Sequence, residues 1–246
     1  MGLAVWSPVV RAAEIADPAG GFSVQVALAG AQVCVVLPKG PTDAGCDGID
    51  VDAMRKGIAA AKDPPFGFVV IRTDDQPFMV TLAKMDVRTV STESIQATVQ
   101  GSLEATKDMA PGVPVSVHGD APAARYDLVE LNGANVVRYA IDLNVPPEHS
   151  KYPMSRMQYY VVAARNVTYN VGFTGDRSHA KEVRELGDAV MKTLRVPPFK
   201  NEDFGQSRDF ARGRLMGSVL GKLVGVGFVL ALVILLVRQR NKKAPR

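Results

Sequence analysis

The chain has 246 residues, of which 47% are hydrophobic and 22% charged, and its formal net charge is +4 at pH 7. Five of the positive charges stand in residues 238–246, so the rest of the chain is close to neutral, which argues against a nucleic-acid-binding surface. Residues 14–198 are long enough for one domain that buries most of its apolar surface, and no repeat or low-complexity segment interrupts them.

Residues 1–13 are short and mostly apolar, and the small residues Ala12 and Ala13 offer a cleavage position before Glu14. This pattern is typical of the end of a secretory signal peptide. The segment has no basic start, and Pro8 interrupts its apolar run. We therefore expect the natural start codon to lie upstream. The alternative is an ordinary N-terminal segment without a targeting role.

Two strands are expected next, at residues 22–26 and 32–37, where apolar residues alternate or run together. Cys34 lies in the second strand, and Cys46 follows it after a turn-rich segment. These are the only two cysteines of the chain, and we favour a disulfide between them in an oxidising compartment. The alternative is that Cys34 is a small, buried apolar residue.

The rest of the domain predicts a mixed fold. Helices are expected at residues 51–61, 91–107 and 179–194, where apolar residues recur on one face. Strands are expected at residues 66–72, 78–88, 115–118, 124–131, 135–145, 157–164 and 167–173, with hairpin turns at Asn132-Gly133 and Arg165-Asn166. This order predicts an α+β domain in which a mostly antiparallel sheet packs with helices.

Three segments resemble the PsbP-like family, which includes the oxygen-evolving-complex subunit PsbP and bacterial lipoprotein or periplasmic domains similar to DcrB. They are the opening strand Gly21-Phe22-Ser23-Val24, the hairpin strands of residues 159–173, and Gly172-Phe173-Thr174-Gly175 before a helix that ends in Leu194-Arg195-Val196. The resemblance spans most of residues 21–198 and implies an α/β/α sandwich with a role in assembly or partner binding. The Pro and Trp that often follow the opening strand in that family are absent here, and the family has no shared catalytic residues to carry over.

No catalytic motif is found. The three histidines, His118, His149 and His179, have no HExxH, GxSxG or glycine-rich phosphate loop beside them, and solvated or capping roles suit them better. If the protein is an enzyme, His118 or His149 would act as the base. No cofactor or metal is expected. The alternative is Ca²⁺ bound by the aspartates near Cys46, but these lack the spacing of an EF-hand, and helix N-termini attract aspartate in any case. These aspartates are Asp43, Asp47, Asp50 and Asp52.

A protein partner is expected to contact the loop of residues 146–153, which mixes aromatic, basic and acidic groups between two strands. The side chains proposed for this contact are Glu148, His149, Lys151 and Tyr152.

Residues 215–237 form a nearly unbroken apolar segment, with Ser218 and Lys222 as its polar exceptions. About 20 such residues cross a hydrocarbon core of roughly 30 Å, so a single transmembrane helix is predicted, preceded by a linker at 199–214. The alternative is a buried core helix. The basic tail of residues 238–246 favours a cytoplasmic C-terminus and a domain on the periplasmic side, and the alternative is a tail anchor with a cytoplasmic domain.

Glycine recurs every four residues in this segment, at Gly217, Gly221 and Gly225. Such a ridge allows helices to approach closely, in a homo-oligomer or with another membrane protein, although glycine is common in membrane helices in any case. The function expected is a single-pass, non-enzymatic extracytoplasmic binding or assembly module acting on an envelope protein. The alternatives are a hydrolase or other enzyme whose site assembles only in the fold, and an accessory subunit that stabilises a larger membrane complex.

Overall fold

The structure is a computed structural model. It describes residues 12–17, 19, 21–28, 30–40, 44–60, 65–73, 76–85, 90–120, 124–145, 155–164, 167–197, 199 and 204. Among these residues no helix has both the length and the apolar character needed to cross a membrane. The predicted transmembrane helix at 215–237, its glycines and the basic tail lie outside the described residues.

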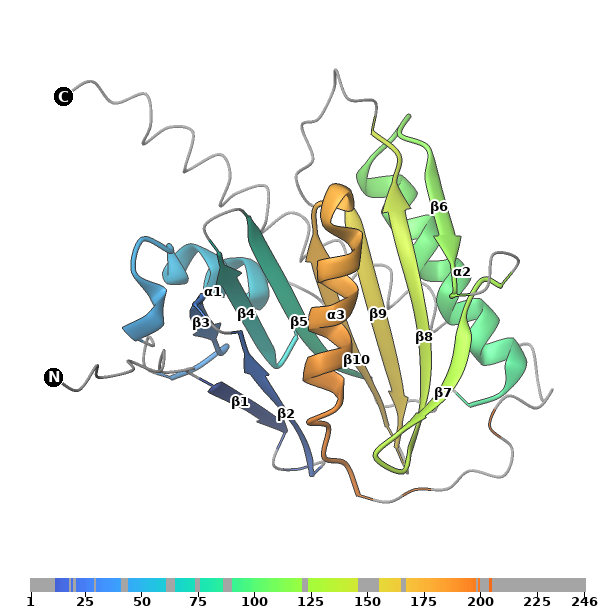
Figure 1. Ribbon diagram of the computed structural model, residues 1–246, viewed down its shortest axis with the longest axis horizontal. Helices are drawn as coiled ribbons and strands as arrows, with labels where there is room; N and C mark the ends of the chain where they lie inside the picture. Colours follow the sequence, from blue (N-terminus) through green and yellow to red (C-terminus); the bar gives the residue numbers. More distant parts are fainter. Residues whose placement is uncertain are drawn as a thin grey trace, which may run out of the picture.

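One large antiparallel sheet forms the centre of the domain (Figure 1). Its strands follow the order β3-β4-β5-β10-β9-β8-β6, and β7 also pairs with β8. The strands are β3 (Gln32–Val36), β4 (Gly67–Arg72), β5 (Pro77–Met85), β6 (Val115–His118), β7 (Asp127–Leu131), β8 (Ala134–Leu143), β9 (Arg156–Ala163) and β10 (Thr168–Gly175). The order predicted from the sequence, a mostly antiparallel sheet with helices, is confirmed.

The first two strands, β1 (Ala12–Asp17) and β2 (Phe22–Ala27), form a separate two-stranded sheet. This corrects the expectation that the strand at residues 22–26 opens the main sheet. Strand β1 was not predicted, and it begins within residues 1–13, which we assigned to a signal-peptide remnant. The sequence pattern of β1 is weak because Ile15 is the only large apolar side chain of the strand. Ile15 is 1% exposed, so packing against the core decides the conformation of β1.

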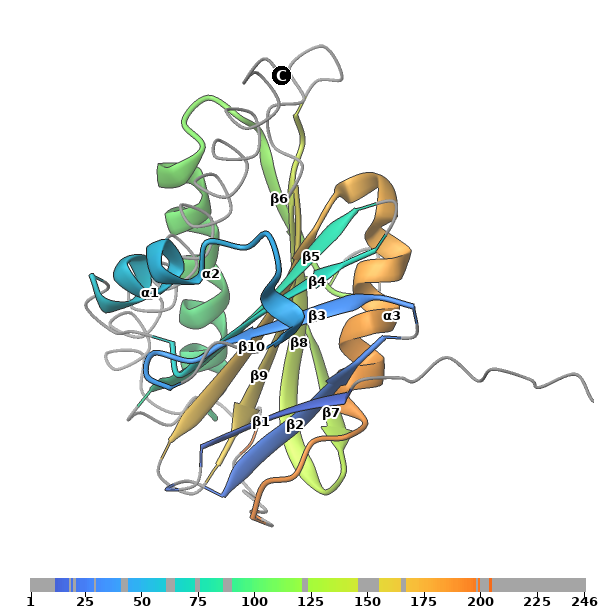
Figure 2. The same cartoon turned by 90° about the vertical axis from the view of Figure 1, so that its left-hand side faces the viewer.

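The helices lie on both faces of the main sheet (Figure 2). Helix α3 (Ala180–Met191) and strand β2 share one apolar core with β9 and β10. Helices α1 (Val51–Ala59) and α2 (Thr92–Met109) pack on the opposite face, α1 against β3 and β4 and α2 against β8 and β9. The domain therefore has three layers, with the sheet in the middle.

Local signals explain where these elements begin. The Asp50 carboxylate accepts a hydrogen bond from Ala53 N at the start of α1, and Ser91 Oγ accepts one from Ser94 N at the start of α2. The predicted turn between β7 and β8 is confirmed, because Asn132 and Gly133 both have positive φ angles, of 49° and 76°. These angles define the turn that a two-residue Asn-Gly hairpin adopts.

The predicted disulfide between Cys34 and Cys46 is present, with the two Cα atoms 4.6 Å apart. It joins edge strand β3 to the short 3-10 helix η1 (Ala44–Cys46). Gly45 allows this close packing, because a Cβ atom there would lie 1.9 Å from Val33 O. Cys34 is also fully buried, so it is both a disulfide partner and a small apolar residue of the core.

Strand β1 is held to the main sheet by the Asp17 carboxylate. Its Oδ2 accepts a hydrogen bond of 2.9 Å from the Tyr169 hydroxyl on β10 and lies 3.0 Å from Lys84 Nζ on β5. Burial by itself raises the pKa of Asp17, but the hydrogen bonds from Lys84 and Tyr169 and the charge of Lys84 lower it more, so the pKa lies below its usual value of 3.8.

We expect Asp17→Asn to lower the free energy of unfolding by about 1–2 kcal/mol at pH 7 and by less at about pH 3, below the usual aspartate pKa of 3.8. A carboxyl whose pKa is depressed by folding stabilises the protein above the pKa of the unfolded chain, and this contribution is lost as the pH falls through the folded-state pKa. Urea unfolding at several pH values measures it. Glu14→Gln, on the exposed side of β1, is the control and should change the free energy of unfolding by less than about 0.5 kcal/mol. An Asp17→Asn deficit of the same size at both pH values would contradict the assignment.

Candidate functional site

Charged side chains gather on one face of the main sheet, beside helix α3. The helix contacts β9 and β10. Strands β8, β7 and β6 lie to one side of the helix and are not covered by it (Figure 1). Successive residues of a strand point to opposite faces. The odd residues of β8, such as Tyr139 and Ile141, belong to the core under α2, so the even residues Arg138 and Asp142 face the α3 side. The paired positions on β9 and β6 bring Arg156 and His118 to the same side.

Three of these side chains form a compact cluster. Arg156 Nη1 donates to both carboxylate oxygens of Asp142, each at 3.0 Å. His118 Nε2 lies 2.9 Å from Asp142 Oδ2 and 3.0 Å from Arg156 Nη1. The side chains of Arg156 and Asp142 are only 10% and 8% exposed, so this is a buried ion pair with a histidine beside it.

A second network connects the sheet to helix α3. Arg184 on the helix donates from Nη2 to Asp120 Oδ2 at 2.8 Å, and Arg138 on β8 also donates to Asp120. Arg138 Nη1 reaches Asp188 Oδ1 at 3.3 Å. Four charges from β8, α3 and the segment after β6 are thereby paired, and the helix is fixed against this edge of the sheet.

Tyr160 on β9 completes this network by donating from its hydroxyl to Asp188 Oδ1 at 2.6 Å. Burial, and then the hydrogen bond to the Asp188 carboxylate, raise the pKa of the Tyr160 phenol well above its usual value of 10.0. The hydroxyl therefore keeps its proton and acts as a donor.

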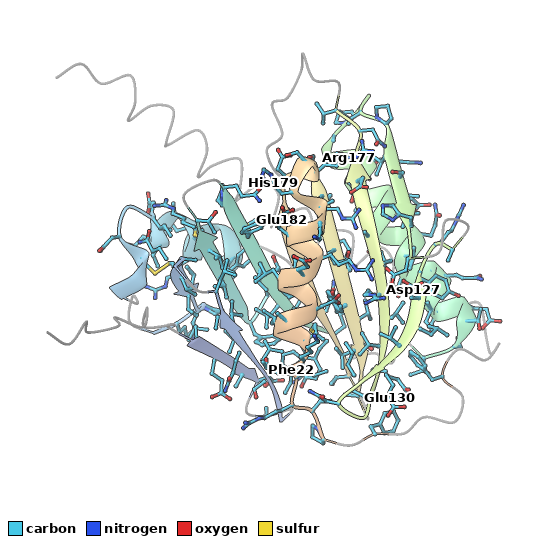
Figure 3. All side chains as sticks on the ribbon, viewed as in Figure 1. Phe22, Asp127, Glu130, Arg177, His179 and Glu182 are labelled. Atoms are coloured by element: carbon cyan, nitrogen blue, oxygen red, sulfur yellow. A yellow bond between two sulfur atoms is a disulfide. The ribbon has the colours of Figure 1, made fainter. Side chains whose placement is uncertain are left out.

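An open polar pocket of about 190 Å³ lies beside the two networks. Side chains that line it include His118, Asp120, Asp127, Arg156, Gln158 and Arg184. Asp127 lies on β7, at the side of the sheet away from α1 (Figure 3). The volume is about six times the roughly 30 Å³ that one water occupies in the liquid, and it is below the range of about 300–1,000 Å³ typical of drug-sized ligands. The pocket can thus take a small polar molecule.

The hydrogen bonds of Arg156 leave part of its guanidinium open. Nη2 donates to Gln158 Oε1 at 3.3 Å, and Gln158 Nε2 in turn donates to the Tyr139 carbonyl at 3.1 Å. Arg156 Nε is buried and has no hydrogen-bond partner. A charged N–H group left without an acceptor costs free energy, and because this atom is shielded from solvent, a molecule in the pocket does not touch it.

The pocket joins a histidine to a carboxylate, which are two of the three groups that the enzyme hypothesis requires. The third is a nucleophile, and no serine, threonine or cysteine is among the described residues that line the pocket. In the described part of the chain no three His, Cys, Asp or Glu side chains come together as a metal site would need.

The residues singled out from the sequence are not brought together here. The Cys34–Cys46 disulfide lies at β3, the edge strand farthest from β6. The proposed partner residues lie outside the described part of the chain. They are Glu148, His149, Lys151 and Tyr152. His179 lies at the start of α3 (Figure 3), where its Nδ1 is 3.0 Å from Ser178 Oγ.

Asp142, Arg156 and Arg138 were missed as site residues in the sequence. A signal was present, since Arg138 and Asp142 interrupt a long apolar strand four residues apart and therefore share a face. Charged residues at such positions need partners, and in this fold the partners come from β6, β9 and α3.

No known protein family matches the sequence, and no curated protein matches it. Among solved structures, one that is similar is the solution structure of cyanobacterial PsbP (CyanoP) from Synechocystis sp. PCC 6803, with a TM-score of 0.48 and 11% sequence identity. The match covers 80% of this chain and 98% of that chain. The likeness is too distant for any residue or activity to be carried over. The class of the domain follows from its own elements, an antiparallel sheet flanked by helices in an α+β fold.

Proposed function

We propose that the protein is a single-pass membrane protein whose α+β domain lies outside the cytoplasm and binds an envelope partner without catalysing a reaction. Residues 215–237 would form the anchor, and residues 238–246 the cytoplasmic tail. The resemblance of three sequence segments to PsbP-like proteins also fits a role in assembly or partner binding.

The observation that carries this proposal is the Cys34–Cys46 disulfide. Disulfides persist in oxidising compartments and are rare in the cytosol, where thiols are kept reduced. The bond therefore favours a domain outside the cytoplasm. Together with the basic tail, it supports a type I arrangement over a tail anchor.

The binding role is supported by the polar pocket of about 190 Å³, which offers charged groups of both signs. Gly217, Gly221 and Gly225 would allow the anchor to associate with a second copy or with another membrane protein. The partner loop with Glu148, His149, Lys151 and Tyr152 remains the proposed protein contact.

The experiment that tests this proposal combines protease treatment with thiol labelling. The full chain is expressed in a bacterial host, and intact spheroplasts are treated with protease. A second sample is denatured and its thiols are labelled with a polyethylene glycol maleimide, before and after reduction. We expect the domain to be digested from outside and the cysteines to react only after reduction. The Cys34→Ala/Cys46→Ala variant is the control and should never gain mass.

The opposite result would be a domain protected until lysis, with cysteines that react without reduction. It would place the domain in the cytoplasm, as in a tail-anchored protein, and overturn the proposal.

A further inference from the structure

We propose that the pocket between β6, β8, β9 and α3 binds a small zwitterion that carries one carboxylate and one primary ammonium group, the chemistry of a free α-amino acid. The inference deepens the proposed binding function by naming a ligand class. It depends on the domain being a binding module but not on the membrane anchor or its orientation.

The arginines supply the half of the site that suits a carboxylate. Arg156 is 8% exposed and lines the pocket from β9. Arg184 lines the same pocket from α3. A guanidinium prefers a carboxylate as acceptor, because two N–H groups can donate to its two oxygens, and hydrogen bonds between charged groups are about twice as strong as neutral ones.

The aspartates supply the half that suits an ammonium. Asp127 Oδ2 accepts a hydrogen bond of 2.8 Å from Asp120 N, and Asp120 Oδ2 accepts from Arg184. Both aspartates line the pocket, and a carboxylate can accept several hydrogen bonds, so each can also accept from N–H donors of a ligand there.

The charge balance excludes the simpler ligands. The arginines and aspartates that line the pocket are equal in number, two of each, so their charges cancel before a ligand enters. They are Arg156 and Arg184, with Asp120 and Asp127. A phosphate would face Asp120 and Asp127, and a simple amine would face Arg156 and Arg184. A zwitterion adds no net charge and meets both sets of groups, which lowers the cost of taking charge out of water.

The test uses the purified full chain in detergent micelles, with the disulfide intact. Isothermal titration calorimetry is done with glycine and L-serine as probes. Acetate and methylammonium each carry one half of the chemistry, and glycine betaine keeps both charges but has no N–H donor. We expect saturable binding of glycine or serine, and binding of the three control compounds at least about tenfold weaker, because each leaves one half of the site unpaired.

Two variants test which residues bind. Asp127→Asn and Arg184→Gln should each weaken glycine binding by at least about tenfold, because each removes one charged partner. Lys181→Gln is the matched control on α3, since Lys181 is 83% exposed and does not line the pocket. Arg156 is left unchanged because its substitution breaks the buried ion pair with Asp142. Circular dichroism of each variant verifies that it is folded.

Folded protein that binds neither glycine nor L-serine would overturn the inference, and so would acetate binding as tight as that of glycine. Equal binding by Asp127→Asn, Arg184→Gln and the unaltered protein would also overturn it. The outcome is distinct from that of the protease experiment, because the purified full chain binds its ligand in micelles whichever side of the membrane the domain faces in the cell.

Discussion

Replacing Asp142 with alanine is expected to lower the free energy of unfolding by about 3–5 kcal/mol. The substitution leaves the buried guanidinium of Arg156 without the carboxylate that accepts two of its hydrogen bonds, and His118 also loses its partner. A buried charge without a counter-ion costs far more than the intact pair contributes. Urea unfolding at pH 7, followed by far-ultraviolet circular dichroism, measures the change.

Two further variants show whether the loss comes from the unpaired charge. Arg177→Ala removes a half-exposed side chain 3.9 Å from the same carboxylate and should cost less than about 1 kcal/mol. Asp142→Leu combined with Arg156→Met removes both charges and should recover most of the stability, as apolar replacements of buried ion pairs often do. A loss below about 1 kcal/mol for Asp142→Ala would show that water reaches Arg156 and that the pair is not buried in solution.

Removing the disulfide by Cys34→Ala/Cys46→Ala is expected to lower the free energy of unfolding by about 3 kcal/mol. The bond joins residues 12 positions apart, and a closed loop of this size reduces the conformational entropy of the unfolded chain by about this amount. It also holds η1 against edge strand β3. The shift of the urea midpoint, measured at constant slope, reports the change.

Reduction gives an independent measurement of the same contribution. The unaltered protein, reduced in denaturant and refolded with reductant present, should unfold at nearly the midpoint of the double variant. Reductant should not change the urea midpoint of the double variant. Identical midpoints for the oxidised and the reduced protein would mean that the bond adds no stability.

The sequence alone predicted most elements correctly where local signals agree. The helices at residues 51–61, 91–107 and 179–194 correspond to α1, α2 and α3, since capping residues and apolar periodicity coincide there. The ends of α3 were placed too far out, because apolar residues such as Leu194 continue the pattern beyond Met191, where the helix ends. Strand β1 was missed because its short, alanine-rich sequence is decided by pairing with β2.

The candidate site was predicted poorly for a physical reason. The sequence analysis named His118 only as a candidate base, with no catalytic motif beside it. Its neighbours Asp142 and Arg156 come from β8 and β9, and Arg184 meets Asp120 from 64 residues away. No local spacing encodes such a meeting, because it depends on which strands pair and in which register.

By itself, the sequence determined the alternating strands, the helices with their caps, and the identity of the disulfide, since two cysteines allow one pairing. These follow from interactions between residues near each other in the chain or from simple counting. The tertiary structure alone decided the strand order, the separate β1–β2 sheet and the pocket with its paired charges. Periodicity tells which face a side chain occupies, but only the assembled core decides which side chains share that face, because burial of apolar surface acts over the whole domain.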